Sequence, residues 1–497
     1  MWNFCLVLAT ILTGPYLQNA GTHGVSVCLE TSAEEKGLKL RWGRTPEELE
    51  TAPRRVPFAF TRAPFSGTWL AVARVDGQPE GTRVCYEVGG RRGETTLWRD
   101  CRDDFTCAFF ADFQSGLKWG DVSYWEEDPF LCGQRIFEDI VASGCEFAVT
   151  AGDLADTGDY EKEIKPLFLE RTCGILGAKM PFFTAFGNHD TAYPANHFFV
   201  VNPTPSSFAF FKNGCLFVCI DDREVGDDKT PGSMRLRVWL EETLSSDAAR
   251  QAKFRFVFQH VPVYVEHFGN CNRWLVDIFE RYGVDCVFSG DHHGYERIFR
   301  GRTRQVTCGC LGWLERDKAS TNAFANVCNW YGDTVAGGHV PVRGRPTWRA
   351  QAPGRPGVLG EPISAEGGIL PGYSILEVKG DTATWTMIGF NADGSKIGPI
   401  DSFTMKSGVR PDKPKAMALE RYVYATAKSG VGLLKYTLTG KGGRTVVVCS
   451  SEKFPKSEPL LGEDFVGVRF TAADGRTRTV RLLADNTLLD DGKGDCE

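Results

Sequence analysis

Hydrophobic and polar positions follow one another in two different ways along this chain, and the change falls near residue 100. Segments within the first hundred residues, such as Val25–Thr31 and Arg83–Val88, alternate apolar and polar side chains as half-buried strands do. Turn residues separate these segments at the spacing of a β-sandwich. We therefore predict an N-terminal β-sandwich domain over residues 1–100.

Beyond that point, apolar runs of strand length alternate with segments of helical character. The runs Thr106–Asp112 and Glu146–Asp153 indicate buried strands, while Pro129–Ser143 and Tyr160–Leu176 indicate helices. Repetition of strand, helix and strand predicts a layered α/β domain. We place this domain at residues 101–410.

The remaining segments predict long loops and then a second β-rich region. Residues 315–365 are rich in Gly, Pro, Arg and Trp, which predicts loops at the edge of the sheet. The segments Tyr373–Val378 and Thr384–Ile388 indicate a hairpin that closes the α/β domain. Short strands such as Thr445–Cys449 follow, and we predict a small β appendage over residues 411–497.

The net charge and the hydropathy of the chain argue against some classes of function. The net charge of -6 argues against a general binder of nucleic acid or of an anionic membrane. A phosphate-bearing small substrate remains compatible with this charge, because a bound metal ion inverts the local field. No stretch approaches transmembrane length, so we predict no integral membrane span. The apolar run Phe4–Leu12 is either a short secretory signal or the first strand of the fold.

The cysteines carry little chemical information. The chain has 17 of them without a paired Cys-x-x-Cys zinc signature, and the odd number leaves at least one unpaired in a monomer. Several lie within apolar runs, where a reduced cysteine behaves as a small hydrophobe. We expect buried free thiols rather than a disulfide framework.

Candidate chemistry lies where the predicted strands end, which is where sites collect in open α/β sheets. The side chains there are carboxylate, amide and imidazole, a mixture of hard oxygen and borderline nitrogen ligands that suits Zn, Mn or Fe. Two such ions, about 3.5–4 Å apart and bridged by one carboxylate, can clamp a phosphoryl group and generate a hydroxide nucleophile. The strand ends carry Asp112, Asp153, Asn188, His260 and the Asp291–His293 cluster.

The order of these motifs within residues 12–400 resembles the calcineurin-like metallophosphoesterase superfamily. The motifs are Asp112, Gly152–Asp153, Gly187–Asp190, His260 and Gly290–His293. Val261–Tyr264 and Gly294–Arg297, which follow the last two motifs, are similar to the purple acid phosphatase branch. That branch commonly carries an N-terminal fibronectin-III-like domain, and Gly14–Gln18 is similar to its opening strand.

The resemblance implies a metal-dependent phosphoester hydrolase with two divalent or mixed-valence transition metals (Zn, Mn or Fe). A metal-bound hydroxide would attack phosphorus in a phosphorylated small-molecule substrate, and we expect a phosphomonoesterase. The alternatives are a phosphodiesterase or nucleotide hydrolase on the same fold, or a catalytically impaired scaffold that binds a surface partner. The resemblance also favours a periplasmic or secreted location.

Metal ligands follow from the resemblance in the same way. Asp153 would be the carboxylate that bridges the two metals. Asp112 and His293 would hold the first metal, and Asn188 and His260 would hold the second.

His189 and Asp190 form the catalytic pair that we assign from the resemblance. His189 would stand beside the scissile phosphate, either as proton donor to the leaving oxygen or as a transition-state cation. Weaker candidates would line the substrate pocket, and for each of them packing or a solvated loop is the alternative. They are Tyr264, His267, His292, Tyr295 and Arg297.

The chain departs from the family pattern at three positions. Gln114 stands where the superfamily often has histidine, and Asp156 stands where the purple branch has tyrosine. Asp156 is a candidate oxygen ligand for the first metal, and without the tyrosinate no purple colour is expected. In the last motif, Asp291 replaces a histidine. Either Asp291 or His292 then ligates the second metal, and Asp291 is favoured because neighbours on an extended segment point opposite ways. The second ion is accordingly held more weakly or is a harder ion.

Overall fold

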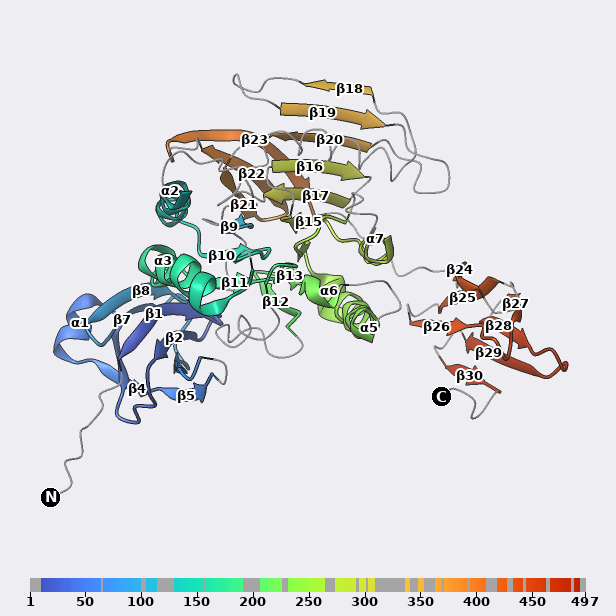
Figure 1. The fold of residues 1–497 in the computed structure, drawn as a ribbon, viewed down its shortest axis with the longest axis horizontal. Coiled ribbons are helices and arrows are strands. Elements are labelled where there is room, and N and C mark those ends of the chain that lie inside the picture. Colours follow the sequence, from blue (N-terminus) through green and yellow to red (C-terminus); the bar gives the residue numbers. More distant parts are fainter. Residues whose placement is uncertain are drawn as a thin grey trace. The chain divides into compact units, whose positions relative to one another are not determined.

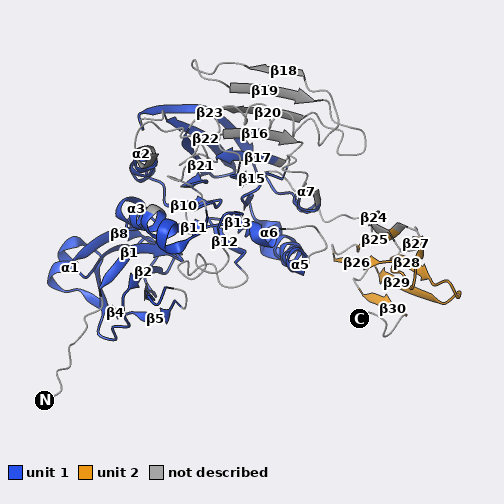
Figure 2. Cartoon of the chain, in the orientation of Figure 1, with its two compact units in different colours: residues 1–407 blue, residues 408–497 orange. Residues whose placement is uncertain are grey.

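The computed structural model describes residues 10–491 apart from internal segments, and the chain divides into two compact units (Figure 2). The first unit spans residues 1–407 and the second spans residues 408–497. Elements are labelled as in Figure 1. The internal segments outside the description are 64–65, 100–103, 114–128, 156, 191–205, 226–230, 264–272, 292–294, 301–302, 309–335, 340–346, 353–362, 369–370, 391–393, 408–417, 427–431, 441–443, 462–464 and 484–486.

The first hundred residues form two four-stranded antiparallel sheets with a shared apolar core. The alternating pattern buries residues such as Val27, Leu40 and Val84 between the sheets, as predicted for a β-sandwich. The helix α1 (Pro46–Thr51) follows β3 and is capped by Thr45. One sheet has the order β1 (Ile11–Gln18), β2 (Val25–Thr31), β6 (Trp69–Val75), β5 (Ala59–Arg62), and the other has β4 (Arg54–Pro57), β3 (Lys39–Gly43), β7 (Arg83–Val88), β8 (Arg91–Thr96).

This β-domain is bonded to the segment that leads into the candidate site. The side chain of Gln18 donates to the carbonyl of Phe182 at 2.9 Å, and the hydroxyl of Tyr86 donates to the carbonyl of Ala178 at 2.8 Å. Tyr16 packs its ring beside that of Phe182. The predicted boundary at residue 100 therefore falls inside the first compact unit, and the fibronectin-III-like label stays a prediction.

The rest of the first unit is built on two sheets, of six and nine strands. Their central strands are parallel, so their carboxyl ends share one edge. The six-stranded sheet has the order β11 (Phe182–Thr184), β10 (Phe147–Thr150), β9 (Phe105–Phe110), β21 (Gly372–Lys379), β22 (Thr382–Phe390), β23 (Lys396–Lys406). The nine-stranded sheet has the order β12 (Phe208–Lys212), β13 (Cys215–Cys219), β14 (Arg255–Phe258), β15 (Cys286–Ser289), β17 (Thr303–Cys308), β16 (Tyr295–Arg300), β20 (Ile363–Gly368), β19 (Thr347–Ala352), β18 (Ala336–His339).

These two sheets pack face to face and helices cover their outer faces, which gives four layers (Figure 1). Strand alternation explains the arrangement. Phe109 faces the second sheet and contacts Phe258 edge to face, whereas its neighbour Phe110 contacts Phe137 on the helical side. The helices over the first sheet are α2 (Pro129–Ala142), η1 (Tyr160–Leu169), α3 (Glu170–Thr172) and η2 (Cys173–Gly177); those over the second are α5 (Pro231–Ser245), α6 (Asp247–Gln251) and α7 (Arg273–Arg281).

The prediction of long loops over residues 315–365 is wrong in part. Three strands, β18 to β20, lie in or across this range and extend the nine-stranded sheet beyond β16. Such strands form through backbone hydrogen bonds to the edge of an existing strand, so they need no apolar pattern. The glycine-rich segment Ala336–His339 has no such pattern. The predicted hairpin is confirmed as β21 and β22.

The second unit contains only strands among its described residues. A three-stranded sheet and a four-stranded sheet enclose a core that includes Tyr436, Leu438, Val468 and Phe470. This is the predicted β appendage. Its strands are β24 (Ala418–Thr426), β25 (Gly432–Thr439), β26 (Thr445–Cys449), β27 (Lys456–Leu461), β28 (Phe465–Thr471), β29 (Thr477–Leu483) and β30 (Leu488–Asp490).

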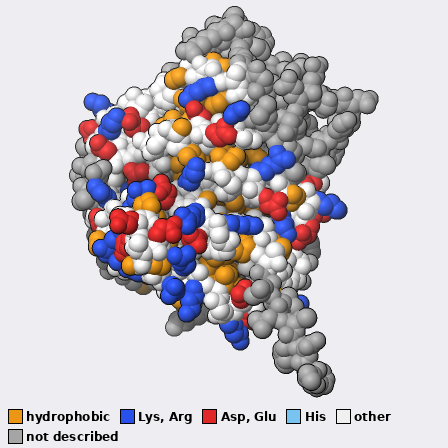
Figure 3. Space-filling view, turned by 90° about the vertical axis from the view of Figure 1, so that its left-hand side faces the viewer, with side chains coloured by type: hydrophobic (Ala, Val, Ile, Leu, Met, Phe, Trp, Pro, Cys, Tyr) orange, Lys and Arg blue, Asp and Glu red, His pale blue; other side chains and the backbone are white. Residues whose placement is uncertain are grey.

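The charged surface residues and the cysteines are arranged as in ordinary globular proteins. On the face shown in Figure 3, Lys and Arg side chains are interspersed with Asp and Glu. Within the described ranges, no helix is long and apolar enough to cross a bilayer. Nine buried cysteines among the described residues are free thiols, and Cys449 is exposed.

Candidate metal centre

Three of the predicted strand-end residues converge in the fold. Asp112 follows β9, Asp153 follows β10 and His260 follows β14, so the edge shared by the two sheets brings them together. One ligand atom from each lies within 4.8 Å of the others, and all three side chains are buried. Two carboxylates and an imidazole at this spacing are a ligand set for a divalent cation.

The imidazole of His260 is held in one tautomer. Its Nδ1 lies 2.9 Å from the carbonyl oxygen of Ala151, which only accepts, so Nδ1 carries the proton. In the neutral imidazole that binds a metal, the lone pair on Nε2 therefore faces the carboxylates, 3.0 Å from Asp153, 3.8 Å from Asp291 and 4.0 Å from Asp112. Nε2 is buried and makes no hydrogen bond of regular geometry within the described part of the chain. An oriented imidazole with a free nitrogen among carboxylates is the arrangement of a metal ligand.

Electrostatics couples these groups tightly. Burial alone would lower the pKa of His260, but the carboxylates of Asp153, Asp112 and Asp291 outweigh it and raise that pKa well above its usual value. Burial alone would raise the pKa of Asp153, but His260 and His189 outweigh it and lower that pKa. The site thus carries an excess of buried negative charge that a bound cation would neutralise.

The aspartates of the site adopt unusual backbone conformations. Asp112, Asp153 and Asp291 have φ of 56°, 50° and 66°, in the left-handed region that aspartate tolerates better than most residues. The other described non-glycine residues there are the turn residues Asn19 and Asn213. Concentration of such backbone at strand ends is typical of functional sites, where the surrounding structure enforces it.

Glycines allow the loops to approach one another. A Cβ on Gly290 would lie 2.4 Å from Oδ2 of Asp112 and 2.9 Å from Nδ1 of His260. A Cβ on Gly187 would lie 2.1 Å from Oδ1 of Asp153. These glycines are therefore required by close packing around the ligands.

Asp190 lies behind the cluster and organises it. Its Oδ2 accepts the backbone N–H groups of Gly187 at 2.8 Å and Asp153 at 3.0 Å, while its Oδ1 accepts that of Leu154 at 2.9 Å. Burial, together with the charge of Asp153, raises the pKa of Asp190 to about 7. The structure thus places this predicted catalytic residue in backbone contacts that fasten two loops together.

The residue pair after β13 is bonded to the loops that carry the cluster, although neither residue is among the predicted site residues. Asp221 forms a two-point ion pair with Arg223, whose Nη1 also donates to the carbonyl of Asp190 at 3.1 Å. Asp222 is buried next to it, and its Oδ1 accepts the backbone N–H of Val261 at 3.4 Å. The sequence does contain a feature that points to this pair, because an apolar run of strand length ends in Asp221 and Asp222. The other strand-end residues were predicted from the same pattern.

Other predicted residues lie near the cluster. The backbone N–H of His189 donates to Oδ1 of Asp153 at 3.0 Å, and its half-buried imidazole interacts with the same carboxylate. Asn188 is exposed beside it. Asp291 donates its backbone N–H to both carboxylate oxygens of Asp112, at 3.0 and 3.1 Å.

Two of the residues predicted to line the substrate pocket, Tyr295 and Arg297, lie within the described part of the chain. Arg297 forms a two-point ion pair with Asp401 of β23, at 2.8 and 3.3 Å, which links the two sheets. Tyr295 begins β16, and its backbone pairs with Cys308. The predictions that fall outside the described residues concern Gln114, Asp156, Tyr264, His267, His292 and His293.

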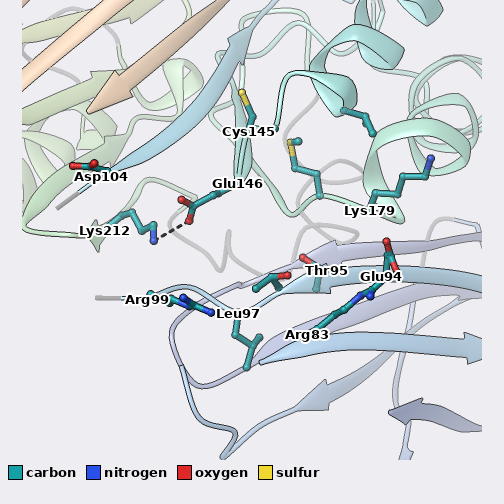
Figure 4. Close-up of a pocket in the computed structure, with 14 residues that line it drawn as sticks. Arg83, Glu94, Thr95, Leu97, Arg99, Asp104, Cys145, Glu146, Lys179 and Lys212 are labelled. Atoms are coloured by element: carbon teal, nitrogen blue, oxygen red, sulfur yellow. Dashed lines mark hydrogen bonds and ion pairs between the residues drawn. The ribbon is translucent and has the colours of Figure 1, made fainter. Parts of the chain in front are cut away.

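A separate cavity of about 600 Å³ opens at the opposite ends of the same strands (Figure 4). It lies between the β-domain and the α/β layers and is lined by Arg99, Asp104 and Glu146 among others. Lys212, only 1% exposed, pairs with Glu146 at 3.0 Å on one wall. Because Asp104 and Glu146 precede β9 and β10, this cavity is remote from the metal-ligand cluster.

Comparison with known proteins finds a family match in the central part of the chain. Residues 96–295 match the family described as calcineurin-like phosphoesterase. The chain is also similar to the serine/threonine-protein phosphatase CPPED1 of Rattus norvegicus, with 27% identity over 167 residues, and of Homo sapiens, with 27% over 168 residues. Each match covers 30% of this chain and 53% of the relative. The chain therefore spans about half the length of the curated relatives it matches.

Two solved structures share the fold. The purple acid phosphatase PPD1 from seeds of yellow lupin (Lupinus luteus) matches with a TM-score of 0.53 and 14% identity, over 79% of this chain and 74% of that one. PhoD matches with a TM-score of 0.52 and 9% identity, over 79% of this chain and 89% of that one. Likeness at these identities concerns the fold alone, and it confirms the predicted layered α/β class with its N-terminal β-domain.

Proposed function

We propose that this protein, whose residues 96–295 belong to the calcineurin-like phosphoesterase superfamily with the fold of its purple acid phosphatase branch, is a metal-dependent phosphoester hydrolase. The observation that carries the proposal is the buried cluster of Asp112, Asp153 and His260. At the shared edge of two sheets, Nε2 of His260 lies 3.0 Å from Asp153 and 4.0 Å from Asp112, and the neighbouring carboxylate of Asp291 lies 3.8 Å from the same nitrogen.

The buried cluster fits a divalent cation, and the family match supports a centre of two such ions. Asp153 would bridge them, because one of its oxygens faces His260 and the other faces the His189 loop. Asp112 would bind the first ion, and Asn188, His260 and Asp291 would surround the second. His293 and Asp156 stay predicted ligands of the first ion, and the identity of the metals, Zn, Mn or Fe, stays a prediction. When bound, such ions supply charge neutralisation for a phosphoryl group and lower the pKa of a coordinated water.

The side chains of this chain would perform the remaining tasks. His189 is half-buried, and its backbone N–H donates to Asp153, which places the residue beside the cluster. We assign to it the proton delivered to the leaving oxygen, or a cationic contact with the developing charge. Asp190 would act by holding the loops of Asp153 and Gly187 in place.

A phosphomonoester is the proposed substrate class. The name of the matched relatives, serine/threonine-protein phosphatase, supports monoester hydrolysis and makes a phosphoserine peptide a suitable probe. The rival within the same fold is a phosphodiesterase or nucleotide hydrolase. Initial rates on p-nitrophenyl phosphate, a phosphoserine peptide and bis(p-nitrophenyl) phosphate separate the two, and a diester rate above both monoester rates would reverse the assignment.

The hydrolase proposal is tested with Asp153→Asn and His260→Ala. Each change removes a ligand atom from the cluster, so hydrolysis of p-nitrophenyl phosphate should fall to background while circular dichroism stays unchanged. Asp104→Asn is the matched control, because that exposed carboxylate lies at the other ends of the strands. Full activity in either cluster variant would contradict the proposal.

One observation favours a second candidate, a binding scaffold with impaired catalysis. Asp291 stands where the resemblance expects a histidine ligand. If that change abolished metal binding, purified protein would contain no transition metal even after reconstitution and would still be folded. Export to the periplasm or outside the cell stays a prediction from the resemblance.

A further inference from the structure

Asp222 stands between the two strand ends that carry the proposed ligands of the second metal. Its backbone N–H donates to the carbonyl of Phe186 at 3.0 Å, just before the loop of Asn188. Its Oδ1 accepts the backbone N–H of Val261, directly after His260, at 3.4 Å. Bonds on both sides fix this carboxylate at the subsite formed by Asn188 and His260.

The neighbouring aspartate provides a contrast. Asp221 is neutralised by the guanidinium of Arg223, at 2.7 and 2.6 Å. Asp222 accepts only the bond from Val261 and has no lysine or arginine partner within the described part of the chain. It is nevertheless 93% buried, since its exposed fraction is 7%. Ionising a buried carboxylate is costly, and a bound cation would add to the favourable contact with His260 and offset that cost.

Two further observations locate that cation. The carboxylate of Asp222 interacts electrostatically with His260 and with Asp291. Oδ1 of Asp291 lies 3.8 Å from the unbonded Nε2 of His260. Asp291 therefore borders the nitrogen of His260, where the family resemblance expects a second imidazole, and the carboxylate of Asp222 interacts electrostatically with both groups.

We propose that Asp222 supplies a carboxylate oxygen to the second metal subsite and, with Asp291, shifts that subsite toward a hard divalent cation such as Mn²⁺. Carboxylate ligands suit Mn²⁺, whereas imidazole ligands suit Zn²⁺. Most sites bind Zn²⁺ more tightly than Mn²⁺. We therefore expect the ratio of the Zn²⁺ affinity to the Mn²⁺ affinity to fall at this subsite, while Zn²⁺ still binds more tightly. The inference rests on the proposed two-metal function and assigns to this chain a ligand outside the family motifs.

The test compares metal binding in wild type, Asp222→Asn and Asp291→His, with Asp104→Asn as control. Chelator-treated protein is dialysed against Mn²⁺ alone and Zn²⁺ alone, bound metal is counted by elemental analysis, and bound Mn²⁺ is followed by electron paramagnetic resonance. Asp222→Asn should weaken the weaker Mn²⁺ site at least about tenfold and spare the tighter one. Asp291→His should raise the Zn²⁺ to Mn²⁺ affinity ratio at least about tenfold, and Asp104→Asn should match wild type.

The outcomes separate this inference from the proposed function. Unchanged Mn²⁺ affinity in a folded Asp222→Asn, with hydrolysis intact, overturns the role of Asp222 and leaves the hydrolase proposal standing. If Asp222→Asn does not fold, Asp291→His decides, and an unchanged affinity ratio overturns the inference. Wild type that binds no metal after reconstitution overturns both proposals.

Discussion

The carboxylate of Asp190 accepts the backbone N–H of Asp153 at 3.0 Å, across 37 positions of sequence. Two further backbone donors, on Gly187 and Leu154, share the same side chain. One buried aspartate thus ties the loop after β10 to the loop after β11. The position of Asp153, the proposed bridging carboxylate, thus depends on a residue that need not contact the substrate.

Replacement of Asp190 by alanine should destabilise the protein and abolish metal binding together. Loss of three bonds to a buried acceptor leaves three donors unsatisfied, which costs at least about 3 kcal/mol of unfolding free energy. Asp190→Asn retains one acceptor oxygen and should lose less. Denaturant unfolding of both variants measures the difference, and an Asp190→Ala protein as stable as wild type would show that these bonds carry no weight.

Gly290→Ala should remove activity with little change in the rest of the fold. The added methyl would lie 2.4 Å from Oδ2 of Asp112, and the carboxylate would have to move. Gly174→Ala is the matched control, because a Cβ there meets nothing within 4 Å. Metal content and hydrolysis of p-nitrophenyl phosphate are compared in the two variants. Equal metal content in both would contradict the close packing described for the site.

The ends of the strands could be predicted from the sequence because the order of apolar and polar side chains indicates which segments are buried. The apolar run before Asp153 indicates a strand buried on both faces, and β10 is fully buried. The convergence of Asp112, Asp153 and His260 then follows from parallel strands that share one edge. The π-helical hydrogen bonding of Tyr160–Leu169 could not be predicted in this way. An amphipathic segment predicts a helix, but it does not show which backbone groups are hydrogen-bonded.

Contacts formed between loops could not be predicted. The three bonds of Asp190 join backbone groups from two loops, and no side-chain pattern records a backbone donor. The setting of Asp222 depends on Phe186 and Val261, which belong to strand ends of different sheets. The interpretation of residues 315–365 as loops failed for a related reason, because sheet edges recruit strands through backbone bonds.

The metal-free protein should lose stability as the pH rises from about 5 to 8. Burial raises the pKa of Asp190 and of Asp222 to about 7, above the usual value near 3.9. The folded state therefore binds these protons more tightly than the unfolded state, and the stability they contribute below pH 4 is lost between pH 4 and 7. The raised pKa of His260 acts in the same direction, since its contribution is present below about pH 6.5 and is lost as the pH rises through the folded pKa.

Urea unfolding of chelator-treated protein at pH 5 and pH 8 measures this loss. Asp222→Asn removes one of the titrating groups, so its stability should change less between the two pH values than that of wild type. A wild-type stability that increases over this range, or an identical change in Asp222→Asn, would contradict the assignment.

Native thiol labelling should be selective. Burial raises the pKa of Cys145 to about 11 and of Cys215 to about 12, and both side chains are enclosed. Cys449 is exposed. Iodoacetamide at pH 8, followed by peptide mass spectrometry, should modify Cys449 and spare Cys145 and Cys215 until denaturant is added. Rapid native labelling of Cys145 or Cys215 would show that the core around them opens.

Metal-dependent hydrolysis is tested most directly by measuring p-nitrophenyl phosphate turnover and bound metal on the same samples. Protein purified without chelator, after chelation, and after return of Zn²⁺, Mn²⁺ or Fe²⁺ provides the series. The proposed function predicts about two metal ions per chain in the active samples, loss of turnover with loss of metal, and recovery of both together. Turnover that persists when elemental analysis finds no transition metal would contradict it.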